Sequence, residues 1–88
     1  MDHRVELQSV MASLNGSDAY VTDDAFFQRV VNDTLRLTGV DDADFAESMN
    51  VSRPTVTRWK LRQSVPHPAI RHTVFAALQK EVERAIRE

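Results

Sequence analysis

Hydrophobic residues recur at helical spacing through most of the chain. In the first segment, the positions that would share one helix face are Val5, Leu7, Val10, Met11 and Leu14. Asn15 and Gly16 follow them, where a helix would end. The pattern predicts an N-terminal helix and loop over residues 1–21, with the loop running from Ser17 to Val21.

A second, longer helix is predicted to begin at Thr22. Threonine is a good N-cap residue, and Asp23 and Asp24 would lie in the first turn, where the helix dipole favours negative charge. Gly39 is expected to end this helix. Between these limits runs a broad apolar stripe formed by Phe26, Phe27, Val30, Val31, Leu35 and Leu37.

Two short helices separated by a tight turn are predicted next. Asp41 or Asp42 would cap the first, whose apolar residues are Phe45, Ala46 and Met49. Asn50 lies where the turn needs a left-handed backbone, which asparagine tolerates better than most residues. Ser52 would cap the second helix, with Pro54 in its first turn. The expected buried residues of this helix are Val56, Trp59 and Leu61.

The last predicted helix begins at Pro68, after a connector over residues 63–67. Its apolar stripe consists of Ile70, Val74, Phe75, Leu78, Val82 and Ile86. No segment alternates with the two-residue period of a strand, and the chain contains no internal repeat. The expected fold class is therefore all-α, with about five helices in a single domain spanning residues 1–88.

Composition narrows the class of protein. The chain has no cysteine, which excludes disulfides, a thiol nucleophile and Cys-ligated metal sites. Two glycines leave no Gly-rich phosphate loop, and there is no Gly-x-Ser-x-Gly elbow, so neither an enzyme nor a cofactor is expected. The longest apolar run is far shorter than the roughly 18 residues of a membrane span. The first residues do not resemble a secretory signal, and we expect a cytoplasmic protein without membrane contact.

No metal site is expected either. His67 and His72 are five residues apart and straddle a predicted helix start, without the regular spacing of two ligands on one helix face. Asp41, Asp42 and Asp44 lack the glycine and terminal glutamate of a calcium loop. These carboxylates are better explained by the favourable charge they bring to a helix N-terminus.

Charge is distributed unevenly along the chain, although the net charge is only −2. Residues 1–47 contain ten acids and three basic residues. Residues 48–80 contain no acid, and their basic residues are Arg53, Arg58, Lys60, Arg62, Arg71 and Lys80. Such a basic stretch in an acidic protein indicates a face that meets a polyanion.

The segment from Asp42 to Leu61, DADFAESMNVSRPTVTRWKL, resembles the helix-turn-helix of the Cro and lambda-repressor-like (XRE-type) DNA-binding proteins. Ala46 matches the small residue where the two helices cross closely. Asn50 occupies the turn position usually held by glycine, and Val51 matches the apolar residue after the turn.

This resemblance extends from Thr22 to about Arg84. It implies a lambda-repressor-like domain, with residues 1–21 as an extra N-terminal helix and loop and residues 42–61 as the helix-turn-helix. It also implies that double-stranded DNA is the partner.

The second helix of the motif has the polar, acid-free surface that suits a major groove, while Trp59 is expected in the core rather than against a base. The candidate DNA-binding residues are Ser52, Arg53, Pro54, Thr55, Thr57, Arg58, Lys60 and Arg62. Base edges are expected to be contacted by Arg53, Thr57 and Arg58. Phosphates are expected to be contacted by Lys60 and Arg62.

The leading functional hypothesis is a sequence-specific transcriptional regulator, a small phage, plasmid or bacterial repressor acting at an inverted-repeat operator. One alternative is an antitoxin or adaptor that autoregulates its operon and binds a protein partner through its N-terminal helix. Another is an accessory or architectural protein in DNA recombination. The choice between repression and activation stays open.

An inverted-repeat operator requires a homodimer, because two half-sites are read across a two-fold axis. The last helix is the first candidate for the dimer seam, through Val74, Leu78, Val82 and Ile86. The N-terminal helix is the competing candidate, through Val10, Met11 and Leu14.

Overall fold

The computed structural model describes residues 3–88, and this part of the chain is all-α, as predicted. Its elements are the helices α1 (His3–Asn15), η1 (Ser17–Tyr20, a 3₁₀ helix), α2 (Asp24–Thr38), α3 (Asp42–Met49), α4 (Arg53–Lys60) and α5 (Pro68–Arg87). No strand occurs within residues 3–88.

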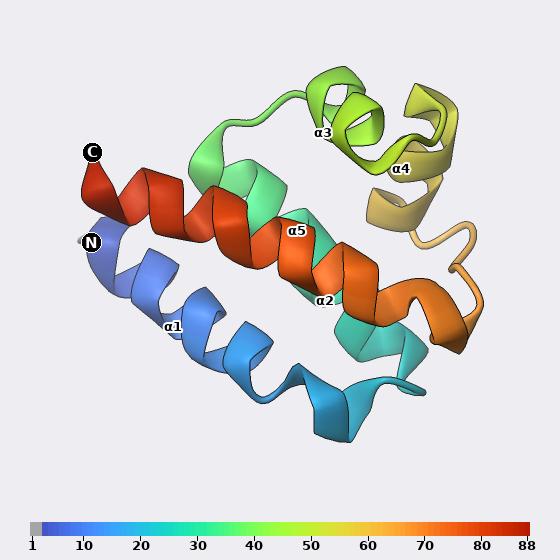
Figure 1. Cartoon of the computed structure of the whole chain (residues 1–88), viewed down its shortest axis with the longest axis horizontal. Coiled ribbons are helices and arrows are strands. Elements are labelled where there is room, and N and C mark those ends of the chain that lie inside the picture. The colour runs from blue at the N-terminus through green and yellow to red at the C-terminus, as the bar shows by residue number, and fades with distance from the viewer. Residues whose placement is uncertain (1–2) are drawn as a thin grey trace.

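Helices α1, α2 and α5 pack together as a bundle, with α1 and α5 antiparallel and side by side (Figure 1). The start of α1 and the end of α5 therefore lie at the same end of the molecule. Helices α3 and α4 form a separate pair that packs on the bundle, α4 against α2 and α3 against α5. The bundle thus serves as a platform for the α3–α4 pair.

The helix starts correct one prediction and refine another. Asp23, and not Thr22, caps α2, because its Oδ1 accepts a hydrogen bond of 2.9 Å from the Phe26 N–H. Asp41 caps α3 through a hydrogen bond of 2.8 Å from the Ala43 N–H. Residues 17–20, predicted as loop, form the 3₁₀ helix η1.

Helices α3 and α4 each end in a hydrogen-bonded turn of the same type. In the first turn, Asn50 has a left-handed backbone with φ 58°, as predicted, and the Val51 N–H donates to the Ala46 carbonyl at 3.0 Å. In the second turn, Arg62 has φ 62°, and the Gln63 N–H donates to the Arg58 carbonyl at 2.9 Å. This is the Schellman arrangement, which satisfies carbonyls at a helix end.

The packing of α1 against α5 shows that both predicted dimer seams are wrong. Val74, Leu78 and Val82 on α5 are each 0 % exposed in a single chain. Val10 and Leu14 on α1 are also buried, and α1 and α5 pack against each other. Each stripe therefore covers most of the other, and only Met11 and Ile86 of the predicted seams are partly exposed.

Two residues assigned to buried stripes lie on the surface instead. Leu61, expected on the inner side of α4, is 60 % exposed because the helix has ended at Lys60. Ile70, in the first turn of α5, is 49 % exposed. Val5 on α1 also has an exposed side chain.

A buried arginine joins three segments of the chain. The Arg71 side chain is 2 % exposed, and its guanidinium lies over the Phe27 ring. It donates hydrogen bonds to the carbonyls of Pro66 at 3.0 Å and Val21 at 3.1 Å, and to the Asp24 carboxylate at 2.8 Å. The connector before α5 and the start of α2 are thereby held to the first turns of α5.

We expect Arg71→Met to lower the free energy of unfolding by about 2–4 kcal/mol, because a buried carbonyl and a part-buried one would lose their hydrogen-bond donor. Thermal and urea unfolding followed by circular dichroism would measure the change. Arg87→Met, at the exposed end of the same helix, is the matched control and should leave stability nearly unchanged. Equal effects of the two substitutions would contradict the structural role of Arg71.

Candidate nucleic-acid interface

The inner face of α4 is fixed by tight packing. Val56 is fully buried, and Trp59 is 3 % exposed, with its ring edge-on to Phe27 at a centroid distance of 5.4 Å. Trp59 is therefore a core residue, as predicted. Ala46 on α3 is also buried, in keeping with the small residue expected between the two helices.

The outer face of α4 begins with its cap. The Ser52 hydroxyl accepts a hydrogen bond of 3.3 Å from the Thr55 N–H, and the two hydroxyls are 2.8 Å apart. Ser52, Arg53, Pro54 and Arg58 are all exposed. The guanidinium groups of Arg53 and Arg58 thus belong to a solvent-facing surface whose backbone is held rigidly from below.

Thr57 and Lys60 face a carboxylate from the neighbouring helix. The Thr57 hydroxyl donates to Asp42 Oδ2 at 2.8 Å, and the Lys60 ammonium donates to Asp42 Oδ1 at 2.8 Å. Asp42 is the first residue of α3, so this contact joins the start of α3 to the end of α4. The positive charge of Lys60 is therefore already compensated within the chain.

The charge state of Asp42 follows from this environment. Partial burial would raise the pKa of its carboxyl, but the hydrogen bonds from Lys60 and Thr57 and the positive charges of Lys60 and Arg53 outweigh it. They hold the pKa of Asp42 below its ordinary value of 3.8. Asp42 is thus ionised at neutral pH and lies close to Arg53.

The basic stretch of residues 48–80 does not form one face. Arg71 is buried and paired with Asp24, so it cannot meet a polyanion. Lys60 is paired with Asp42. Arg62 lies beyond the end of α4, in the turn that follows it, and lines a groove together with residues of α1 and α2. Arg53 and Arg58 are the cations that remain on the face predicted to contact bases.

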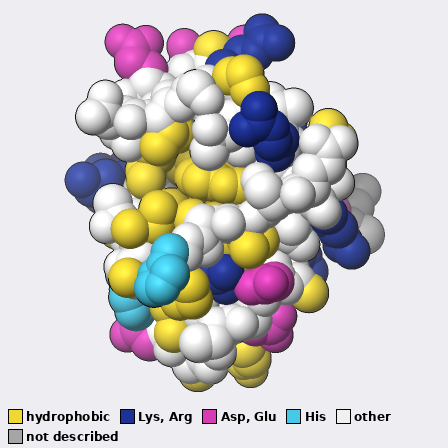
Figure 2. Space-filling model, turned by 90° about the vertical axis from the view of Figure 1, so that its right-hand side faces the viewer, with side chains coloured by type: hydrophobic (Ala, Val, Ile, Leu, Met, Phe, Trp, Pro, Cys, Tyr) yellow, Lys and Arg dark blue, Asp and Glu magenta, His cyan; other side chains and the backbone are white. Residues whose placement is uncertain are grey.

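The α4–α5 connector and the start of α5 form another surface, seen face-on in Figure 2. Hydrophobic side chains gather there, near histidines. The exposed large hydrophobic residues of these segments are Leu61 and Ile70. Among the histidines, His67 caps α5 by accepting from the Ala69 N–H at 3.0 Å, and His72 lies 3.0 Å from an Asp18 carboxylate oxygen.

Sequence reasoning missed the partners of two site residues. Arg71 falls on the same helical face as Val74, Phe75 and Leu78, so a charge on an apolar stripe could have signalled a buried ion pair. The contact between Asp42 and Lys60 joins residues 18 positions apart on different helices, and no spacing rule indicates it.

No family model, curated protein or solved structure matches the chain. Within residues 3–88, no helix is both long enough and apolar enough to cross a membrane. In the same part of the chain, no three His, Asp or Glu side chains come together as metal ligands. The resemblance to the helix-turn-helix family stays a prediction from the sequence.

The Asp42 contact predicts a pH dependence of stability. Because the folded-state pKa lies below 3.8, the stabilisation is present above that pH and is lost as the pH falls through the folded-state value. We expect Asp42→Asn to cost about 0.5–1 kcal/mol at pH 7 and less below pH 4. Urea unfolding at several pH values measures this, with Asp44→Asn, which removes an exposed carboxylate from the same helix, as control. A cost independent of pH would contradict the ion pair.

Proposed function

We propose that this protein is a sequence-specific double-stranded-DNA-binding transcriptional regulator that acts in the cytoplasm of a bacterium or phage-infected cell. One observation carries the proposal. Helix α4 is anchored by the buried side chains of Val56 and Trp59. Its exposed residues include Arg53 and Arg58, and the helix contains no Asp or Glu. A DNA major groove, about 12 Å wide, admits one such helix.

In this proposal the N-terminal half of α4 enters the groove. Arg53 and Arg58 donate hydrogen bonds to base edges, with guanine the preferred base for a bidentate arginine. The capping residue Ser52 and its neighbour Thr55 are short hydroxyl side chains that can contact phosphate oxygens. The phosphate contacts predicted for Lys60 and Arg62 stay predictions.

Asp42 limits how much of the binding energy is purely electrostatic. Its carboxylate neutralises Lys60 and lies near Arg53, and it would repel a phosphate that approaches from the α3 side. Non-specific affinity for DNA depends on the number of phosphates neutralised by free cations. The arrangement therefore favours a protein whose binding depends on base contacts rather than on charge.

The test is selection of a binding site from a pool of randomised duplexes, followed by binding measurements on the selected and a scrambled duplex. We expect Arg53→Ala or Arg58→Ala to cost about 1–3 kcal/mol on the selected site and much less on the scrambled one. Arg87→Ala, at the end of α5, is the control. Failure of any duplex to be enriched would overturn the proposal, and equal losses on both duplexes would assign these arginines to phosphate.

In the same assay, Asp42→Asn should strengthen binding to both duplexes and steepen the salt dependence, because Lys60 gains freedom to pair with phosphate. Weaker binding to both duplexes would instead mean that Asp42 positions α4.

Binding at an inverted repeat would require a dimer, and the exposed residues Leu61 and Ile70 now provide the candidate contact. They flank the connector that follows α4. A two-fold contact at this place would hold the ends of two α4 helices near each other, as reading of two adjacent half-sites requires.

Sedimentation measures this directly. If the chain is a dimer, Leu61→Glu and Ile70→Glu should convert it to a monomer, since each places a charge in the contact. Val5→Glu, at an exposed apolar position on α1, should leave the dimer intact. A dimer that survives both substitutions lies elsewhere on the surface, and a wild-type monomer that protects a single half-site would exclude the model.

The antitoxin or adaptor hypothesis keeps the same DNA-binding unit and adds a protein partner at the N-terminal helix.

A further inference from the structure

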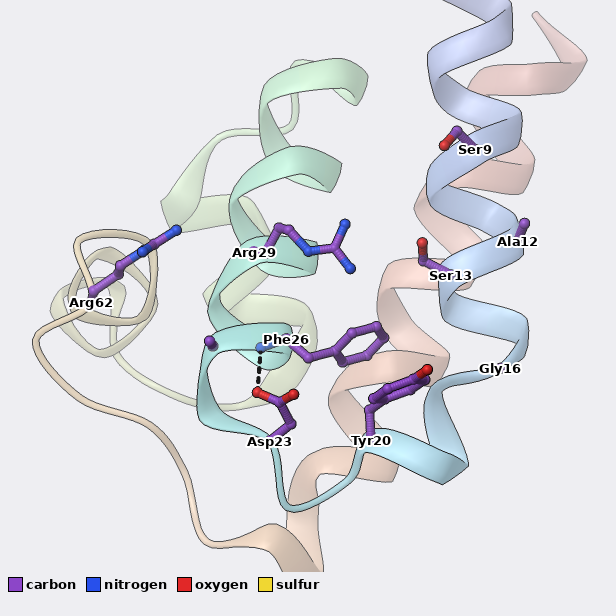
Figure 3. A pocket seen from close by; sticks show the side chains of 10 residues that line it. Ser9, Ala12, Ser13, Gly16, Tyr20, Asp23, Phe26, Arg29 and Arg62 are labelled. Carbon is purple, nitrogen blue, oxygen red and sulfur yellow. Dashed lines mark hydrogen bonds between the residues drawn. The ribbon is translucent and has the colours of Figure 1, made fainter.

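The junction between α1 and η1 holds an asparagine followed directly by a glycine. Asn15 is the last residue of α1, and Gly16 follows it where the chain leaves that helix for η1 (Figure 3). Both residues are exposed. Asparagine is a thermolabile residue, and because glycine has no Cβ, nothing shields the Gly16 nitrogen from the Asn15 side chain. The pair is therefore suited to a reaction between a side chain and the backbone.

The other asparagines of the sequence lack this combination. Asn32 is followed by Asp33 in the middle of α2, and Asn50 is followed by the β-branched Val51. In both places a Cβ and further side-chain atoms crowd the nitrogen that would have to react. Asn15 is the one asparagine in the sequence that precedes a glycine.

The folded backbone restrains the Gly16 nitrogen. Its N–H donates hydrogen bonds to the Ala12 carbonyl at 3.3 Å and to the Ser13 carbonyl at 3.2 Å. Such shared bonds are common at helix ends, and both are longer than the usual 2.9–3.0 Å of an N–H···O bond. The last turn of α1 therefore holds this nitrogen, but local opening of the helix end would release it at low cost.

Helix α5 restrains the Asn15 side chain. Its Oδ1 accepts a hydrogen bond of 3.1 Å from Gln79 Nε2, which joins the end of α1 to α5 along their antiparallel contact (Figure 1). Leu14 and Ser17, on either side of the pair, are 1 % and 5 % exposed. The reactive pair is thus an exposed step between two buried residues.

We propose that Asn15–Gly16 is a site of spontaneous deamidation, and that the docking of the last turn of α1 on α5 sets its rate. The Gly16 nitrogen loses its proton to solvent and attacks Asn15 Cγ. A C–N bond forms, and the side-chain amide nitrogen takes up a proton and leaves as ammonia. One water molecule then opens the resulting succinimide ring at either carbonyl, which yields an aspartyl or an isoaspartyl residue at position 15.

Solvent can reach this step of the chain. Gly16 lines a groove of about 700 Å³ together with Ser13 and Tyr20, and Figure 3 shows Gly16 at the edge of that groove, where α1 ends. Water is the only co-reactant that the two steps need. The proposal does not depend on DNA binding.

Each product would weaken the contact that slows its formation. Either one places a carboxylate at the C-terminal end of α1, where the helix dipole disfavours negative charge, and the last turn of α1 contains no basic residue. The isoaspartyl product also adds one carbon atom to the main chain between the buried Leu14 and Ser17. The last turn of α1 can then no longer keep its fit against α5.

The test follows deamidation of the full chain in mildly alkaline buffer, folded and in urea, by mass spectrometry of tryptic peptides. Trypsin places each asparagine on its own peptide: residues 5–29 carry Asn15, residues 30–36 carry Asn32, and residues 37–58 carry Asn50. We expect Asn15 to react about tenfold or more slowly in the folded chain than in urea, because local opening must come first. Asn32 and Asn50 are internal controls and should stay unchanged over the same time.

Two substitutions separate the restraint from the chemistry. Gln79→Ala should speed the reaction about two- to fivefold in the folded chain and leave it unchanged in urea. Gln8→Ala, at an exposed position on α1, is the matched control. Gly16→Ala should slow the reaction in both states. It should fold normally, because the backbone φ is −98° and the added Cβ would meet only carbonyl oxygens at 3.9 Å.

Three outcomes would overturn the proposal: equal rates in the folded chain and in urea, no reaction of Asn15 in urea, or a folded rate that Gln79→Ala leaves unchanged. The isoaspartyl product, separated by chromatography, should melt at a lower temperature than the unmodified chain and than Asn15→Asp. An unchanged melting temperature would contradict the predicted loss of fit between α1 and α5.

Discussion

The arrangement of the helices depends on the groups that accept hydrogen bonds from the buried guanidinium of Arg71. A guanidinium removed from water must find acceptors in several directions, and here they come from the carbonyls of Val21 and Pro66 and the carboxylate of Asp24. These acceptors lie before α2, before α5 and at the first residue of α2. Phe27, under the guanidinium, also contacts Trp59, so the same centre supports α4. The position of the candidate recognition helix therefore depends on an ion pair in the bundle.

The sequence predicted the elements well because their ends are local events. The left-handed turn at Asn50, the cap at Ser52 and the start of α5 at Pro68 each depend on a few consecutive residues. The wrong prediction of Thr22 as the cap of α2 is also local, because Asp23, one residue later, supplies the side-chain acceptor instead. The partner of each helix was not predictable in this way. Apolar spacing shows which face is buried, but not whether the covering surface belongs to the same chain.

The candidate site was predicted in part for the same reason. Helical spacing correctly separated Val56 and Trp59 from the exposed Arg53 and Arg58. It could not show that Asp42 lies against Lys60, because that contact depends on how α3 and α4 cross. It also placed Arg62 on the α4 surface, whereas this residue lies beyond the end of α4, in a turn with a left-handed backbone, and lines a groove with residues of α1 and α2. The number of charged residues in a stretch of sequence therefore does not show how many of them lie on one surface of the folded protein.

The pairing of α1 with α5 has a consequence for how the chain folds during synthesis. These helices lie at opposite ends of residues 3–88, so the contact between them closes the longest loop in the molecule. Leu7, Val10 and Leu14 leave the ribosome long before their covering surface exists. The α3–α4 pair, by contrast, needs only a short span of chain. The nascent protein therefore has only α2 to cover the apolar side of α1 until α5 emerges, and completion of α5 determines when the platform beneath α4 becomes rigid.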